Sequence, residues 1–223
     1  MSGTAHVETG GVGSVVLDVL RASGALKSGH FLLASGRHGD RYVEKFDLLR
    51  QPRATEAACR GFSGRFAADR IDVVVGPTTG GILLAFEVAR QLGVAAAYAE
   101  RRDDGAPGRE IRRGTTFAPG QRVLVIDDIL TTGGSVRETL AALAPLPVEV
   151  VAVAVLIDRS SGKTVFDVPF FSLANLDSET WEQAECPMCA RGETLVKLGT
   201  TVDPGGAGVA AATGAGAAGA DPN

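Results

Sequence analysis

The chain has 223 residues and a formal net charge of -4, from 26 acidic and 22 basic side chains. This length suffices for one α/β domain with its own hydrophobic core and a small appended subdomain. The acidic balance disfavours nucleic-acid binding through bulk charge, and no apolar run reaches the ~20 residues that span a bilayer. Residues 1–14 lack the basic-then-apolar order of a signal peptide. The sequence therefore predicts a cytoplasmic protein without nucleic-acid or membrane partners.

Both ends of the chain are poor in large apolar side chains. Residues 1–13 are rich in glycine and polar side chains, and residues 203–223 are almost wholly glycine and alanine. Such segments cannot offset the entropy lost on ordering. We therefore expect both ends to be disordered and residues 14–202 to form the domain.

The region before Pro52 predicts a small N-terminal element. Residues 14–21 have the spacing of a helix whose inward side chains are Val15, Val16, Val19 and Leu20. Residues 31–34 and 41–46 have the composition of short strands.

From Pro52 onward the pattern alternates between helices and strands. This alternation predicts an α/β fold with a mainly parallel, twisted sheet flanked by helices and right-handed crossovers. The expected helices are 53–68, 81–92 and 135–143, and the expected strands are 71–75, 95–99, 122–126 and 148–157.

Two further segments complete the predicted organisation. Residues 100–120 are polar, contain glycine and proline, and lack apolar periodicity, which predicts a mobile functional loop. Residues 165–197 carry four large aromatic side chains and are expected to pack over the N-terminal element. The result would be a hood from about 14–50 and 165–198 beside a core of residues 52–160.

The most informative stretch is Arg122 to Ser135, RVLVIDDILTTGGS. An apolar run without alternation predicts a buried strand, so Asp127 and Asp128 would follow it at the carboxyl edge of the sheet, where open α/β folds bind ligands. The small residues 131–135 then open a helix, and their N–H groups can converge on a phosphate. One loop thus offers acceptors for hydroxyls and donors for a phosphate, which suits a ribose 5-phosphate.

Residues 125–135 resemble the phosphoribosyl-diphosphate (PRPP) signature of the type I phosphoribosyltransferases. The resemblance implies their fold, with catalytic Asp127 and Asp128 facing the ribose 2′- and 3′-hydroxyls. It also implies that the rest of this loop binds PRPP, with residues 131–135 around the 5′-phosphate: Ile129, Leu130, Thr131, Thr132, Gly133, Gly134 and Ser135.

A second turn, residues 75–82, resembles the diphosphate loop of the same family. The resemblance assigns PRPP binding to Thr78, Thr79, Gly80 and Gly81, at a helix N-terminus that favours anions. Many orotate enzymes of the family have an aromatic residue and a lysine where this chain has Thr79 and Gly80. The diphosphate charge must therefore be neutralised by other residues.

The loop of residues 100–120 carries five arginines that could do so. Arginines that close over the site would help most as negative charge develops on the departing diphosphate, and we expect Arg101 and Arg102 to be catalytic in this sense. The resemblance implies a homodimer in which this loop reaches the neighbouring active site. The alternative is a solvated, charge-balanced loop.

Two segments bear on the acceptor base. Residues 25–31, followed by Ser35-Gly36-Arg37, are similar to the N-terminal segment of orotate phosphoribosyltransferases, which implies that Lys27 contacts orotate and PRPP. Arg159 follows a strand like the family's arginine for the orotate carboxylate, which a guanidinium binds bidentately. Thr131 is also expected beside orotate.

The resemblance therefore implies transfer of the phosphoribosyl group from PRPP to orotate, giving orotidine 5′-monophosphate and diphosphate in pyrimidine biosynthesis. Mg²⁺ would be the cofactor, held mainly by PRPP without a direct protein ligand. Two alternatives stay open: a phosphoribosyltransferase for a purine or other base, and a PRPP-sensing regulator that does not turn over.

The three cysteines do not indicate one chemistry. Cys59 lies in an expected helix, and Cys186 and Cys189 form a CxxC pair. A closed zinc site needs four ligands, and the three histidines all lie in the N-terminal quarter of the sequence. We therefore expect a tight turn with packed or occasionally oxidised thiols, with a metal site within one chain or shared between subunits as the alternative.

Overall fold

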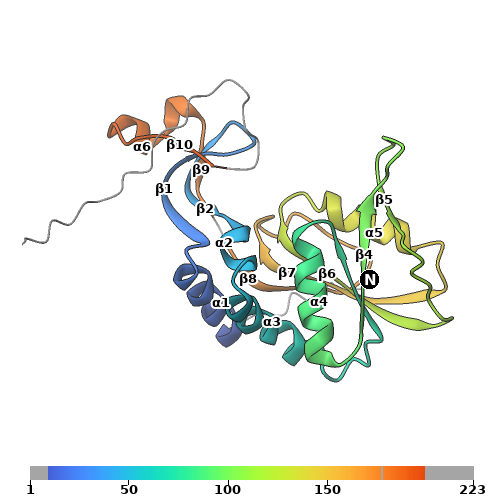
Figure 1. Ribbon diagram of the computed structural model, residues 1–223. Helices are drawn as coiled ribbons and strands as arrows, with labels where there is room; N and C mark the ends of the chain where they lie inside the picture. Colours follow the sequence, from blue (N-terminus) through green and yellow to red (C-terminus); the bar gives the residue numbers. More distant parts are fainter. Residues whose placement is uncertain (1–9, 177, 199–223) are drawn as a thin grey trace, which may run out of the picture.

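The computed structural model describes residues 10–176 and 178–198. These residues form a six-stranded sheet with helices on both faces and, beside it, a smaller four-stranded hood (Figure 1). The predicted α/β class is confirmed. Residues 203–223 and 1–9 lie outside the described residues, whereas residues 10–13, expected to be disordered, begin the first helix.

The main sheet places β6 at its centre. Its order is β5-β4-β3-β6-β7-β8, and all neighbours are parallel except β5, which is antiparallel to β4. The central position explains the unbroken apolar run of β6, because both faces of the strand are covered. The strands are β3 (Val73–Pro77), β4 (Ala95–Arg101), β5 (Arg109–Ile111), β6 (Gln121–Leu130), β7 (Val148–Asp158) and β8 (Phe170–Asn175).

Alternate side chains of the sheet enter two separate cores. Leu124 and Ile126 belong to the core beneath α1, α3 and α4, whereas Val123 and Val125 belong to the core beneath α5. The helices are α1 (Gly10–Ala22), α3 (Pro52–Phe66), α4 (Gly80–Leu92) and α5 (Gly134–Leu143). In α1, Val16 and Leu20 are buried as predicted, but Val15 is 57% exposed, so its assignment to the inward face was wrong.

The hood combines the two ends of the folded chain. Its sheet has the order β10-β1-β2-β9 and rises from the main body in Figure 1. Its strands are β1 (Leu26–Leu32), β2 (His38–Val43), β9 (Thr180–Trp181) and β10 (Val196–Lys197), followed or preceded by the short helices α2 (Lys45–Leu49), η1 (Gln183–Glu185) and α6 (Pro187–Ala190).

The hood is smaller than the sequence predicted. β8, which was expected in it, is parallel to β7 in the main sheet, and α1 packs against β8 and α3. The expected strand 41–46 ends at Val43 because Glu44 caps α2, its carboxylate accepting a hydrogen bond from the Phe46 N–H. The expected strand 31–34 instead begins at Leu26.

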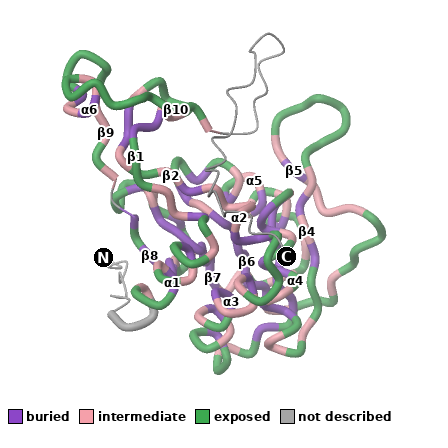
Figure 2. Tube along the Cα trace, turned by 60° about the vertical axis from the view of Figure 1, so that its left-hand side comes forward, coloured by how far each residue is buried: buried purple, intermediate pink, exposed green. Residues whose placement is uncertain are grey.

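Residues 100–120 are not devoid of regular structure. β4 extends to Arg101 and pairs with β5, so that Arg101 lies opposite Arg109 in an antiparallel hairpin. The end of this hairpin is exposed (Figure 2), and it projects beside the carboxyl edge of the sheet. None of the helices among the described residues has the length and apolar character needed to cross a membrane.

Candidate active site

The paired aspartates lie inside β6, near its carboxyl end. The strand continues to Leu130, because Asp127 and Leu130 still pair with Val155 and Asp158 of the longer neighbour β7. The expectation that the aspartates follow the strand is therefore wrong by four residues. Asp127 and Asp128 are 5% and 4% exposed, so both carboxylates must be satisfied by close partners.

Asp127 faces the phosphate-loop side of the site. Its Oδ1 accepts a hydrogen bond from the Asp128 N–H at 2.8 Å, and its Oδ2 accepts one from the Ser135 hydroxyl. Burial raises the pKa of Asp127, and the neighbouring charge of Asp128 raises it further. The site thus holds an acid whose ionised form is costly.

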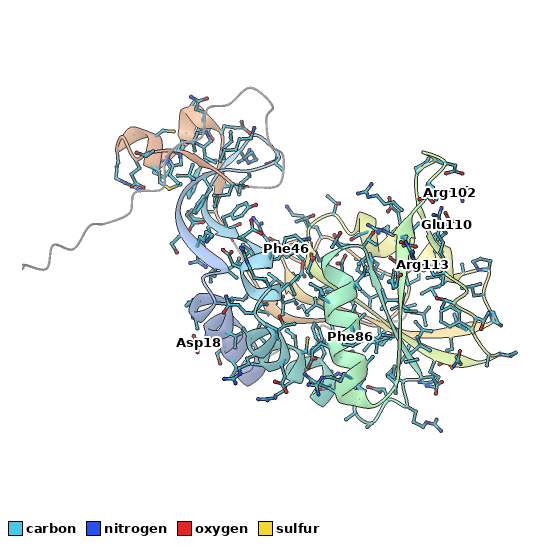
Figure 3. The ribbon with its side chains drawn as sticks, in the orientation of Figure 1. Asp18, Phe46, Phe86, Arg102, Glu110 and Arg113 are labelled. Carbon is cyan, nitrogen blue, oxygen red and sulfur yellow. The ribbon has the colours of Figure 1, made fainter. Side chains whose placement is uncertain are left out.

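Asp128 faces the hood and pairs with a lysine that the sequence analysis missed. Its Oδ2 lies 2.7 Å from Nζ of Lys45, an ion pair without a well-aligned hydrogen bond. Lys45 begins α2, the short helix between hood and sheet, close to Phe46, which is labelled between these parts in Figure 3. Lys45 belongs to no recognisable sequence motif, and its contact with Asp128 follows from the position of α2.

The turn before α4 requires glycine for lack of space. A Cβ on Gly80 would lie 1.9 Å from Oδ2 of Asp128, and one on Gly76 would lie 2.0 Å from the Gly81 carbonyl oxygen. Gly80 therefore lets the Asp128 carboxylate approach the N-terminus of α4. Because residue 80 has no side chain, the ammonium group beside Asp128 comes from Lys45 of another element.

Side-chain hydrogen bonds hold the backbone of the loop of residues 131–134. Thr164 donates a hydrogen bond to the Thr131 carbonyl, and Arg137 donates one to the Thr132 carbonyl. Gly133 has φ 79°, and a Cβ there would lie 2.8 Å from Thr164. With no side chain capping α5, the N–H groups at its start remain available to an anion.

In residues 129–132, some side chains are buried in the core and some contacts are made by the backbone. The Leu130 side chain is 1% exposed and belongs to the core, while its carbonyl accepts a hydrogen bond from the Arg159 N–H. The Ile129 N–H donates to the Asp128 carboxylate. Thr131 and Thr132 are exposed. Leu130 can therefore contribute to binding only through its backbone.

The loop arginines have different surroundings. Arg109 is buried and donates hydrogen bonds to Oγ1 of Thr78 at 2.7 Å and to the Ala99 carbonyl, with Glu138 of α5 as its ionic partner. Burial lowers the pKa of Arg109. This arginine fixes the hairpin against the turn before α4.

Of the other hairpin arginines, Arg112 is half-buried and the rest are exposed. Arg102 pairs with Asp104, Arg112 with Asp103 and Glu110, and Arg113 with Glu100; Arg102, Glu110 and Arg113 are labelled on the hairpin in Figure 3. Among the described residues, Arg101 has no carboxylate within ion-pairing distance. Arg101 is thus the hairpin arginine that could meet an anion without giving up a carboxylate.

Arg159 follows β7, close to Tyr42 of the hood. Its Nη2 donates to Oγ of Ser178 at 3.3 Å, and its buried Nε has no hydrogen-bond partner among residues 10–176 and 178–198. Burial lowers the pKa of Arg159, and that of Tyr42 is raised mainly by burial and also by Glu44. An unpartnered buried donor is a costly feature that a carboxylate ligand would relieve.

Lys27 pairs with an aspartate of α2 and not with Asp127 or Asp128. Its Nζ lies 2.8 Å from the Asp47 carboxylate and donates to the Gly24 carbonyl. The hydrogen bond from Lys27 is the main cause of the lowered pKa of Asp47. In this arrangement Lys27 joins β1 to α2, and its expected contact with orotate and PRPP would require it to leave Asp47.

The structure brings two histidines to the CxxC pair, although the sequence places them far from it. His30 and His38 lie beside Cys186 and Cys189 in the hood, with one candidate ligand atom from each within 4.8 Å of the others. Their separation in sequence, about 150 residues, gave no indication of this proximity, which β9, α6 and β10 create by returning to β1 and β2.

Comparison with known proteins identifies the fold and family. The phosphoribosyl transferase domain matches residues 47–190. The orotate phosphoribosyltransferase of Caldanaerobacter subterraneus subsp. tengcongensis is 44% identical over 185 residues, which cover 83% of this chain and 96% of that protein. The chain belongs to the orotate phosphoribosyltransferase family. A second member, from Heliobacterium modesticaldum, is 43% identical over 187 residues, covering 83% and 96% of the two chains.

Solved structures of orotate phosphoribosyltransferases share the architecture. That from Aeropyrum pernix superposes with a TM-score of 0.62 at 28% identity, covering 72% of this chain and 93% of that one. The Mycobacterium tuberculosis enzyme, in complex with inorganic phosphate, gives a TM-score of 0.60 at 27% identity, covering 74% and 95%. The predicted type I phosphoribosyltransferase fold is confirmed.

Proposed function

We propose that the protein transfers the 5-phosphoribosyl group from PRPP to orotate, giving orotidine 5′-monophosphate and diphosphate. The observation that carries this proposal is the juxtaposition of the buried Asp127–Asp128 pair with the open N-terminus of α5 in a chain of this family. Carboxylates suit the ribose hydroxyls, and free N–H groups suit the 5′-phosphate. The sheet edge thus matches both halves of the phosphoribosyl group.

In the proposed reaction, N1 of orotate attacks C1′ as the bond from C1′ to the diphosphate oxygen breaks, with inversion at C1′, and the N1 proton passes to the departing diphosphate or to water. The protein need not form a covalent intermediate. Its contributions are to hold the reactants in line and to stabilise the charge that develops on the leaving diphosphate. Thr78, Thr79 and Gly81, with Gly80 at the start of α4, provide the turn that the diphosphate would approach.

We assign to Lys45 the charge that the missing lysine of this turn would supply. Its ammonium group lies next to the Asp128 carboxylate, which itself lies beside Gly80 at the start of α4, so it could serve the diphosphate or a ribose hydroxyl without large movement. Arg101 of the hairpin would add a second cation, and Arg102 a third once it separates from Asp104. Arg109 would position Thr78 and the hairpin.

Orotate would bind between the hood and the end of β7. The Nε of Arg159, which has no partner among the described residues, supports this placement, because a guanidinium can donate to a planar carboxylate. Thr131 lies on the neighbouring loop. A purine base has no carboxylate to use this arginine, which makes a purine phosphoribosyltransferase the weaker candidate.

Mg²⁺ fits the donor set as a substrate-bound ion. Both oxygens of Asp127 already accept hydrogen bonds, and Asp128 is paired with Lys45. The carboxylates are therefore not arranged as a free metal cage, so PRPP oxygens and water would supply most ligands. When bound, the ion would neutralise charge on the diphosphate.

We further propose a cytoplasmic homodimer in which the β4–β5 hairpin reaches the neighbouring active site. Leu83 and Phe86 of α4 support an association surface, being 42% and 65% exposed large apolar side chains on one helix face. Phe86 is labelled on α4 in Figure 3. Sedimentation of the wild-type protein and of Phe86→Glu would test this; a monomeric wild type would refute it.

The activity is tested by following the ultraviolet absorbance of orotate in the presence of PRPP and Mg²⁺. We expect turnover with orotate and none with adenine or hypoxanthine. Turnover with a purine alone would overturn the base assignment, and PRPP binding without turnover would identify a sensor instead.

In the same assay Arg159→Ala should raise KM for orotate at least about tenfold while PRPP binding changes little, since a charge-assisted hydrogen bond contributes about 1.5–3 kcal/mol. Equal losses for both substrates would refute its role.

A further inference from the structure

The hood contains a cluster of metal-ligating side chains that the phosphoribosyl site does not use. His30 lies on β1, His38 begins β2, and Cys186 and Cys189 flank and occupy α6. His30, His38 and Cys186 are 3%, 2% and 2% exposed. α6 sits at the far end of the hood from β6 in Figure 1, so the cluster is separate from the Asp127–Asp128 edge. We propose that these four side chains bind a structural zinc ion.

The distances within the cluster match those around a tetrahedral ion. Bonds of about 2.3 Å to sulfur and about 2.0–2.1 Å to nitrogen place tetrahedral ligands at roughly 3.5 Å for sulfur and nitrogen, and roughly 3.3 Å for two nitrogens. Nε2 of His30 lies 3.5 Å from Sγ of Cys186 and 3.6 Å from Sγ of Cys189. Nδ1 of His38 lies 3.3 Å from Sγ of Cys189 and 2.8 Å from Nε2 of His30. Of these four distances, the last departs most from the tetrahedral value and would lengthen on binding.

Hydrogen bonding orients His30 as metal-bound histidines are oriented. Its Nδ1 lies 2.9 Å from the Glu193 carbonyl oxygen, which can only accept, so Nδ1 carries the hydrogen. In the neutral ring Nε2 therefore presents a lone pair to the centre of the cluster. A backbone carbonyl behind a ligating histidine is a common support for a metal site.

Without a cation, the centre of the cluster is poorly satisfied. The single lone pair on Nε2 of His30 is shared by three neighbours, namely the His38 ring and the two sulfur atoms. Only one of them can make a well-directed hydrogen bond to it at a time. A central divalent cation would satisfy all four groups, with both cysteines as thiolates.

The donor set favours zinc over harder ions. Two sulfur and two nitrogen ligands in a tetrahedral arrangement are typical of closed structural zinc sites, whereas Mg²⁺ and Ca²⁺ take oxygen ligands. Cys186 and Cys189 are not joined by a disulfide. A β-bulge between Ser28 and Phe31 changes the register of β1 at His30, which allows this side chain to meet His38.

The position of the cluster indicates that a bound ion would stabilise the hood. β9 and β10 have two residues each, and neither His30, Phe31, Cys186 nor Met188 belongs to the two main hydrophobic cores. Small units with little core of their own commonly depend on a metal. The ion would fasten the C-terminal segment to the β1–β2 hairpin, whose second strand leads to Tyr42 and Lys45.

Metal analysis of the full-length protein, purified under reducing conditions without chelator, tests the proposal. We expect about one zinc per chain in the wild type and in Cys59→Ala, which removes the cysteine outside the cluster and serves as the matched control. Cys189→Ser and His38→Asn should each lose most of the zinc. Zinc that stays bound in both variants would overturn the proposal.

Titration of the metal-depleted wild type with Co²⁺ covers the case in which the variants do not fold. We expect the intense visible bands of a tetrahedral site and a sulfur-to-cobalt charge-transfer band, with Zn²⁺ displacing the cobalt. Weak octahedral bands would overturn the proposal. So would a wild-type protein that carries no metal and whose two hood thiols are both alkylated at once or joined by a disulfide.

Discussion

Replacing Asp127 by asparagine should stabilise the ligand-free protein. The pKa of Asp127 is raised from 3.8 to about 6, chiefly because the carboxylate is buried. A pKa difference of one pH unit corresponds to 1.36 kcal/mol, so ionised Asp127 costs the folded state up to about 3 kcal/mol at pH 7.5. Asparagine keeps an acceptor for the Asp128 N–H and gains a donor for the Ser135 hydroxyl, so the change removes charge without emptying the position.

The stability gained by Asp127→Asn should depend on pH. Between pH 3.8 and about 6 the folded protein binds more protons at Asp127 than the unfolded chain does, so the wild type loses stability as pH rises through this window. The advantage of Asp127→Asn should therefore be small near pH 4 and reach its full size above pH 6.5.

Denaturant unfolding from pH 4 to pH 8 measures this difference. Asp18→Asn is the control, because Asp18 is an exposed residue of α1 whose ionic partner among the described residues is Arg21. An Asp127→Asn protein no more stable than the wild type at pH 7.5 would refute the reasoning. The same variant should lose PRPP binding, measured by calorimetry, so the gain in stability would accompany a loss of function.

Three further substitutions test the surroundings of Asp128 and the hairpin. Lys45→Met should lower kcat/KM at least about tenfold in the orotate assay, because it leaves Asp128 without its cation; an unchanged rate would exclude Lys45 from the site. Gly80→Ala should abolish measurable PRPP binding, since its Cβ would meet the Asp128 carboxylate, and normal binding would show that the turn can move. Arg109→Lys should lower the midpoint of thermal unfolding by several degrees through loss of the bonds to Thr78 and Ala99, whereas Arg102→Lys, the control at the exposed tip, should not.

The sequence predicted the elements whose cause is local. The apolar run of β6, the glycines before α4 and α5, and Pro52 at the start of α3 each determine the backbone through residues close in the chain. The type of nearly every core helix and strand could therefore be predicted, with boundaries displaced by one to four residues. The extension of β6 past Asp128 could not, because it depends on pairing with β7.

The features that sequence reasoning missed depend on contacts between distant segments. Lys45 meets Asp128 only because α2 crosses from the hood to the sheet edge. The histidines meet the cysteines only because the C-terminal segment returns to β1 and β2. Arg109 resembled the other hairpin arginines in sequence, and its burial against Thr78 follows from the short strand β5. No pattern within a window of ten residues contains this information.

The pairing of charges along the β4–β5 hairpin has a kinetic consequence. Residues 100–113 contain five arginines and four acidic residues, and most of the exposed arginines already have a carboxylate neighbour. Opposite charges held this close cancel beyond about one Debye length, roughly 8 Å at physiological ionic strength. The hairpin therefore exerts little long-range attraction on a polyanionic substrate, and encounter should occur at a rate that varies only weakly with salt. High affinity for PRPP would therefore arise from slow dissociation once short-range contacts have formed, and not from fast association.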